Sequence, residues 1–219
     1  MRGGTSKGVF FHRRDVPADQ AALDAMLLKV LGSPDPNGRQ LNGMGGGISS
    51  LSKAVVIGPP SRPDADVDYT FAQVAVDRPL VDYSSNCGNL SSAVGPFAVD
   101  EGLLKVSGSE TLVRIHNTNT QRVVHARFPL NNGVAEIDGD FELPGVAGTG
   151  ARIDLEFLSP GGATTGELLP GDGTTDTIRD PGDGAEYHVS LVDASNGTVF
   201  VSAQALGLIG TEAPDIIEQ

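Results

Sequence analysis

The sequence predicts an α+β protein built mainly from β-strands, with two helices of moderate length. Short apolar or alternating runs recur along the chain between clusters of turn-forming residues, which is typical of strands. Longer helical periodicity is confined to two segments. The 219 residues include 29 glycines and 14 prolines, are 39% hydrophobic and contain no tryptophan, as expected for a turn-rich globular protein.

Two helices and one short helical turn are predicted. Over residues 17–31, apolar residues recur at every third or fourth position from Ala22 to Leu31. Gly32 and Pro34 are typical of the end of a helix. A second helix of small and aliphatic residues is predicted over 90–99, and a short helix near 202–206.

The strands are predicted from short buried-type or alternating runs. They lie at residues 9–11, 54–57, 69–81, 111–117, 122–128, 134–143, 151–158, 187–192 and 198–201. The long segment 159–183 is expected to be a glycine-rich and then acidic loop. In the predicted hairpin 111–128, His116 and His125 could face each other, but without a third ligand in sequence reach we interpret them as polar surface rather than a metal site.

Composition excludes several function classes. A formal charge of −13 without a Lys/Arg cluster argues against a nucleic-acid partner. One cysteine allows neither an internal disulfide nor a multi-cysteine metal site. No stretch reaches the ~18 apolar residues of a membrane span, and the N-terminus has no apolar signal region, so a cytoplasmic protein is expected.

The N-terminal stretch 1–8 is a glycine-rich loop followed by a strand. A phosphate-binding P-loop needs the opposite order, strand then loop then helix, so nucleotide binding is rejected. Backbone N–H groups with Arg2, Thr5, Ser6 and Lys7 could instead hold carboxylates. A frayed chain end explains the same residues equally well.

A second glycine-rich loop, residues 35–52, leads directly into Lys53 and the apolar strand 54–57. A loop of this length within a compact domain is a candidate binding loop. Partial desolvation at the mouth of a buried strand would lower the pKa of Lys53 and make it a base. The alternative is a lysine that extends into solvent from the strand end.

The only cysteine, Cys87, lies in the polar stretch 84–92, between a predicted strand and a predicted helix. The positive end of a helix dipole favours a thiolate at such a turn. A small buried hydrophobic side chain is the alternative. A cysteine hydrolase is disfavoured, because the four histidines are scattered and none lies in a recognisable activating motif.

Four of these motifs together closely resemble the PrpF family. They are residues 1–8, the loop 43–53, Ser85–Asn89 and Gly162–Gly166. The family comprises 2-methylaconitate cis-trans isomerases and 4-oxalomesaconate tautomerases, and is similar in fold to diaminopimelate epimerase. Residues 193–201 look like the family's second substrate-loop motif, except that Gly197 stands where a proline is usual.

The resemblance implies a fold of mostly antiparallel strands wrapped around a central helix, as one of two similar halves. It makes Lys53 and Cys87 the acid–base pair of a cofactor-free proton transfer, with no metal. It also implies a set of residues around the carboxylates of a small di- or tricarboxylate substrate. These are Arg2, Gly4, Thr5, Ser6, Lys7, Ser49, Ser50, Asn86, Gly88, Asn89 and Asn196.

The resemblance also shapes two expectations about the whole chain. Residues 1–219 are expected to form a PrpF-like N-terminal domain that lacks the first strand and the second half of the full fold. The leading functional prediction is an isomerase or tautomerase of unsaturated polycarboxylates that acts by 1,3-allylic proton transfer. The alternative is a catalytically incomplete fragment that binds a polycarboxylate or assists an aconitase-like dehydratase. A homodimer is left open.

Overall fold

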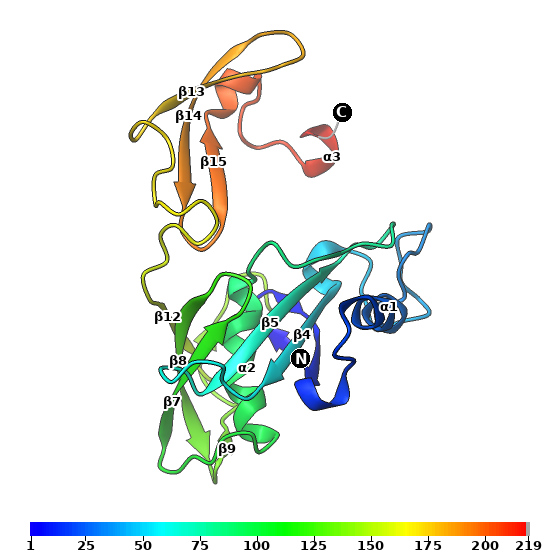
Figure 1. Ribbon diagram of the computed structural model, residues 1–219, viewed down its shortest axis with the longest axis vertical. Helices are drawn as coiled ribbons and strands as arrows, with labels where there is room; N and C mark the ends of the chain where they lie inside the picture. Colours follow the sequence, from blue (N-terminus) through cyan, green and yellow to red (C-terminus); the bar gives the residue numbers. More distant parts are fainter. Residues whose placement is uncertain (218–219) are drawn as a thin grey trace. The chain divides into compact units, whose positions relative to one another are not determined.

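The computed structural model describes residues 1–217 and divides the chain into two compact units (Figure 1). Unit 1 comprises Met1–Leu158 and unit 2 comprises Ser159–Gln219. Each unit is described by itself. The expectation that the whole chain forms one N-terminal half of a larger fold stays a prediction.

Unit 1 is built on an eight-stranded sheet with the order β12-β8-β7-β5-β4-β3, with β6 paired to β5 and β9 to β8. The strands are β3 (Val9–His12), β4 (Lys53–Gly58), β5 (Val67–Val74), β6 (Val81–Asp82), β7 (Glu110–Asn117), β8 (Arg122–Asn131), β9 (Val134–Ala135) and β12 (Asp154–Phe157). Only the pairs β3–β4 and β5–β7 are parallel. The prediction of an α+β fold with mostly antiparallel strands is therefore confirmed.

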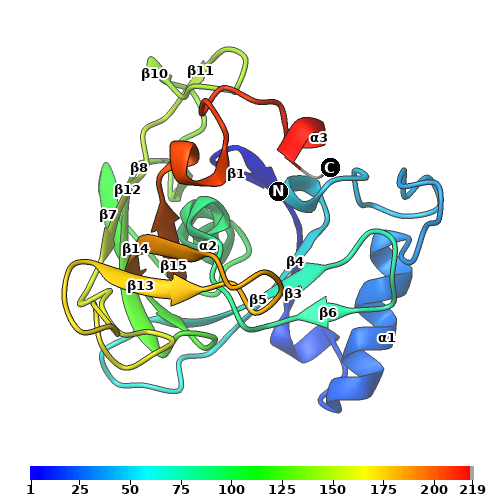
Figure 2. The same ribbon diagram turned by 90° about the horizontal axis from the view of Figure 1, so that it is seen from above.

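The helix α2 (Gly88–Asp100) is the centre of unit 1. It contacts strands β1 (Arg2–Gly3), β2 (Ser6–Lys7), β7, β8, β9 and β12, and Figure 2 shows the sheet of unit 1 curling around it. Leu90, Val94 and Ala98 are fully buried against sheet residues. This confirms the predicted central helix, which begins two residues earlier than expected. Burial of nearly its whole surface explains why the segment lacks a polar face.

The helix α1 (Gln20–Leu31) lies against a second face of the sheet. It begins later than predicted because Asp19 caps it, accepting the backbone N–H of Ala22. It ends as predicted, at Gly32 in the left-handed conformation. Leu27 and Leu31 pack in a cluster of buried residues that includes residues of β4 and β5.

Two predicted strands are wrong in extent. The segment 69–81 is not one strand, because β5 ends at Val74 and the chain turns through Asp77–Pro79 to return as β6. Proline and aspartate there favour a turn. The segment 134–143 contains only β9 and, after the turn formers Asp138–Asp140, β10 (Phe141–Glu142), which pairs with β11 (Thr149–Gly150).

Unit 2 is a three-stranded antiparallel sheet in the order β13-β14-β15. Strands β14 (Glu186–Asp193) and β15 (Gly197–Val201) confirm two predictions. Strand β13 (Asp176–Arg179) was predicted to be loop, since its sequence has one apolar residue. The short helix predicted near 202–206 is a 3₁₀ turn, η3 (Ala203–Leu206), and α3 (Pro214–Ile217) follows it.

The two hairpin histidines do not face each other. The register of β7 and β8 places His116 opposite Val123, and His125 opposite Arg114. His116 is only 3% exposed, with Nδ1 2.9 Å from Oδ1 of Asp68, so its interpretation as polar surface is wrong. Within residues 1–217, no group of three histidine, cysteine or acidic side chains is arranged to hold a metal ion.

Helix length also bears on membrane association. Across the part of the chain that the structure describes, no helix is both long and apolar enough to cross a bilayer.

Candidate active site

Lys53 begins β4 and lies directly opposite Gln73 of β5. It is only 8% exposed, and its Nζ donates to Oε1 of Gln73 at 2.5 Å. Nζ also lies 5.0 Å from the ring centre of Phe71. Burial lowers the pKa of Lys53, while the electrostatic interaction with Cys87 acts in the opposite direction. Lys53 is therefore a desolvated amine rather than one extended into solvent.

A buried glutamine, Gln40, makes hydrogen bonds to the loop before Lys53. Gln40 is 1% exposed, and its side chain bonds the hydroxyls of Ser33 and Ser52 and accepts the backbone N–H of Gly47. The hydroxyl of Ser52 in turn donates to the carbonyl of Val74. These contacts give the glycine-rich loop a defined path.

At its end the loop forms the 3₁₀ turn η2 (Ser49–Leu51), which contacts β2. Ser49 is exposed and Ser50 is half-buried. Both predicted serines therefore lie beside the N-terminal motif.

Cys87 is the residue that precedes α2. It is 8% exposed, and its Sγ lies 3.9 Å from Oγ of Ser6. Its carbonyl accepts the hydroxyls of Ser91 and Tyr69, at 3.0 and 3.4 Å. The sequence left open whether Cys87 is a small buried side chain or a thiol at the start of a helix. In the structure it is both buried and located at the start of the 13-residue helix α2.

The N-terminal motif is an ordered hairpin rather than a frayed end. Strands β1 (Arg2–Gly3) and β2 (Ser6–Lys7) pair, and the turn between them uses Gly4 at φ 53°. A Cβ on Gly3 would lie 2.5 Å from the carbonyl oxygen of Asn89, so only glycine allows the hairpin to approach α2 this closely. The side-chain amide of Asn89 donates to Oγ1 of Thr5 at 3.0 Å.

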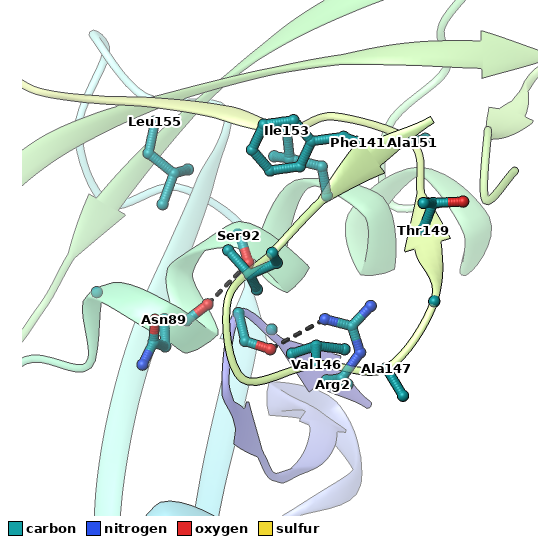
Figure 3. Close-up of a pocket in the computed structure, with 16 residues that line it drawn as sticks. Arg2, Asn89, Ser92, Phe141, Val146, Ala147, Thr149, Ala151, Ile153 and Leu155 are labelled. Atoms are coloured by element: carbon teal, nitrogen blue, oxygen red, sulfur yellow. Dashed lines mark hydrogen bonds between the residues drawn. The ribbon is translucent and has the colours of Figure 1, made fainter. Parts of the chain in front are cut away.

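A cavity of about 250 Å³ lies beside this hairpin (Figure 3). Four of the predicted substrate residues line it: Arg2, Gly4, Gly88 and Asn89. Apolar side chains from the β10–β11 region and β12 form much of the rest of its lining, and Phe141, Ile153 and Leu155 are labelled in Figure 3. Lys53 and Cys87 do not line this cavity.

Several residues that shape the site were not singled out by the sequence. Gln73 contacts Lys53, and Asn117 and Asn119 bond the segment that leads to Cys87. The run from Asn117 to Thr120 forms the turn of the predicted hairpin 111–128. Its repeated asparagines were the available signal, since asparagine side chains commonly bond nearby backbone.

Two further motifs meet within unit 2. Asp193 is fully buried, and its Oδ2 accepts the backbone N–H groups of Thr164 and Thr165 and the hydroxyl of Thr165. Burial by itself raises the pKa of Asp193, but these hydrogen bonds outweigh it and hold the pKa below its usual value. Asn196 is exposed in the adjacent turn between β14 and β15.

Comparison with solved structures identifies proteins of similar fold. A probable proline racemase from Agrobacterium radiobacter K84 has a TM-score of 0.52 over 92% of this chain and 46% of its own, at 14% identity. A crystal structure of methylitaconate-delta-isomerase reaches a TM-score of 0.76 at 44% identity, over 99% of this chain and 55% of its own. The chain therefore shares its fold with the methylitaconate-delta-isomerase and the probable proline racemase.

A model of the PrpF protein family matches residues 1–219, and the chain belongs to this family. It is 44% identical to the 3-methylitaconate isomerase of Eubacterium barkeri, over 99% of this chain and 56% of that protein. It is 42% identical to the 2-methyl-aconitate isomerase of Cupriavidus necator, over 99% and 57%. The 4-oxalomesaconate tautomerase of Pseudomonas putida is 44% identical over 100% and 58%. The chain therefore spans somewhat more than half the length of these relatives.

Proposed function

We propose that this chain supplies the acid–base pair of an isomerase or tautomerase that acts on unsaturated di- or tricarboxylates. The observation that carries the proposal is that Lys53 and Cys87 are both buried beside the N-terminal hairpin: Sγ of Cys87 lies 3.9 Å from Oγ of Ser6, and a Cβ on Gly8 would lie 3.1 Å from the carbonyl oxygen of Lys53. The relatives named as isomerases of 3-methylitaconate and 2-methylaconitate, and as a tautomerase of 4-oxalomesaconate, support the substrate class.

The proposed reaction is a 1,3-allylic proton transfer. One of the two residues removes a proton from a carbon next to the double bond, and electrons delocalise over the three-carbon system and the neighbouring carboxylate. The other residue then returns a proton to the far end of that system. Because burial lowers the pKa of Lys53, more of its amine is unprotonated and able to act as the base at a given pH.

Polar groups around the pair are suited to hold carboxylates. The hairpin β1–β2, the serines of η2 and the start of α2 offer N–H groups, hydroxyls and cationic side chains. Such groups stabilise the enolate-like charge that develops during proton removal. Asn196, in unit 2, is proposed as a carboxylate-binding residue on the strength of its motif alone. A homodimer is also an expectation, and sedimentation would measure it.

Deuterium exchange tests the proposal directly. The chain is incubated in D₂O with 2-methylaconitate, 3-methylitaconate or 4-oxalomesaconate, and solvent deuterium entering the allylic positions is followed by ¹H NMR. We expect exchange with at least one of these compounds, and a loss of about 100-fold or more in Lys53→Met and in Cys87→Ser. Lys105→Met, which changes an exposed lysine, is the matched control.

Two outcomes oppose the proposal. Undiminished exchange in the Lys53→Met/Cys87→Ser double variant removes both residues from the chemistry. Carboxylate binding seen by calorimetry without exchange would favour the alternative, a binding or accessory fragment.

A further inference from the structure

Gln73 makes three hydrogen bonds that link β5 to the Ser49–Ser52 segment and to Lys53. Its Nε2 donates to the backbone carbonyls of Ser49 and Ser52, at 3.1 and 3.0 Å. Its Oε1 accepts from Nζ of Lys53. Lys53 and Gln73 are register partners in the β4–β5 pair, whereas Ser49 and Ser52 lie in the segment that precedes β4.

These partners determine which way the amide faces. The two carbonyl oxygens can only accept, so the NH₂ group of Gln73 must lie toward them. The amide oxygen is thereby directed at Lys53. The reversed orientation would place the amide oxygen against two carbonyl oxygens, losing both of those hydrogen bonds, and would remove the acceptor to which Nζ donates.

An acceptor in this position constrains the amine. A neutral lysine amine has two N–H donors and one lone pair, and it takes a proton through the lone pair. Since Oε1 of Gln73 can only accept, it engages an N–H, and the lone pair is directed elsewhere. The Phe71 ring occupies a second side of Nζ. An uncharged amide does this without holding the proton on Lys53 as strongly as a carboxylate would.

We propose that Gln73 is a positioning residue, which orients the amine of Lys53 for proton transfer and ties it to the Ser49–Ser52 segment. The inference rests on the proposed function of Lys53 as an acid–base group. It adds a residue outside the glycine-rich motifs.

Two variants separate orientation from charge. Gln73→Glu keeps the shape but adds a negative charge, and Gln73→Leu removes the acceptor. Gln204→Glu, an exposed glutamine in unit 2, is the charge control. Backbone amide spectra of each variant establish that unit 1 is folded.

The first readout is independent of activity. The ¹³Cε resonance of Lys53 is followed over pH in lysine-labelled protein, and Gln73→Glu is expected to raise its titration midpoint by about 1 pH unit or more. Gln204→Glu should leave the midpoint in place. An unchanged midpoint in folded Gln73→Glu would overturn the inference.

The second readout is exchange kinetics. Gln73→Leu is expected to lower kcat about 10-fold or more with little change in KM, because an orienting contact acts on the chemical step. In Gln73→Glu, the pH–rate profile should shift to higher pH by about as much as the titration midpoint of Lys53. Wild-type kcat in both folded variants would also overturn the inference. A chain without any exchange activity, but with the shifted titration, would overturn the proposed function while supporting the Gln73–Lys53 contact.

Discussion

The side-chain amide of Asn117 donates to the side-chain oxygen of Asn86 across 2.6 Å, and both residues are buried. Oδ1 of Asn117 accepts the backbone N–H groups of Asn119 and Thr120. Asn119 bonds the carbonyl of Tyr83. The turn between β7 and β8 thus holds the segment that carries Cys87, although the two are about thirty residues apart in the sequence.

Asn117→Ala is expected to lower the free energy of unfolding of unit 1 by about 1–3 kcal/mol, because it leaves the backbone N–H groups of Asn119 and Thr120 and the Asn86 oxygen without this partner. It should also speed alkylation of Cys87, since its supporting segment loosens. Chemical denaturation and thiol-modification rates measure the two effects. Asn37→Ala, at an exposed position, should change neither; alkylation at the wild-type rate in Asn117→Ala would contradict the positioning role.

Gly3→Ala is expected to destabilise unit 1 by about 1–3 kcal/mol. The added Cβ would lie 2.5 Å from the Asn89 carbonyl oxygen and 2.9 Å from Cα of Leu90, both backbone atoms that cannot move freely. Gly88→Ala is the matched control, because its Cβ would meet only the Phe157 ring at 3.7 Å. Thermal unfolding followed by circular dichroism gives the comparison, and equal stabilities would show that the hairpin does not pack on α2 in this way.

Lys53→Met should stabilise unit 1 at neutral pH. Burial lowers the pKa of Lys53 in the folded state, so the unfolded chain binds more protons between that pKa and the ordinary value of about 10.4. The wild-type free energy of unfolding therefore rises with pH across this window, and the variant lacks this rise.

Denaturation at a series of pH values measures the difference between Lys53→Met and wild type. It should be largest near neutrality and shrink toward pH 10.4. Lys105→Met should show no such trend. A difference independent of pH would mean that Lys53 titrates normally.

Asp193→Asn is expected to loosen the loop 162–166 of unit 2. Hydrogen bonds hold the pKa of Asp193 below its usual value despite burial. The stability that its carboxylate contributes is therefore present above pH of about 3.9 and is lost as pH falls through the lowered pKa.

Hydrogen–deuterium exchange of residues 162–168 reports this loop. In Asp193→Asn these amides should be less protected from exchange at neutral pH, and their protection should no longer fall as the pH is lowered. Asp172→Asn, which changes an exposed carboxylate, should behave as wild type. Protected amides in Asp193→Asn would show that the loop does not depend on this carboxylate.

Local signals in the sequence were enough to locate the elements that carry the candidate site. The helical periodicity before Gly32, the apolar run after Lys53 and the change of character at Cys87 are each decided by neighbouring residues. They predicted α1, β4 and the start of α2 to within three residues. The family resemblance rested on the same local motifs.

The relations between these elements were decided only by the tertiary structure. Cross-strand register is a long-range property, and a slip of one residue would exchange the two faces of a strand. Register placed Gln73 opposite Lys53, and it paired His116 and His125 with other residues. Neither pairing could be predicted from the sequence. The sequence by itself determined which residues could perform acid–base chemistry; folding decided which neighbours desolvate and orient them, because those contacts join strands distant in the chain.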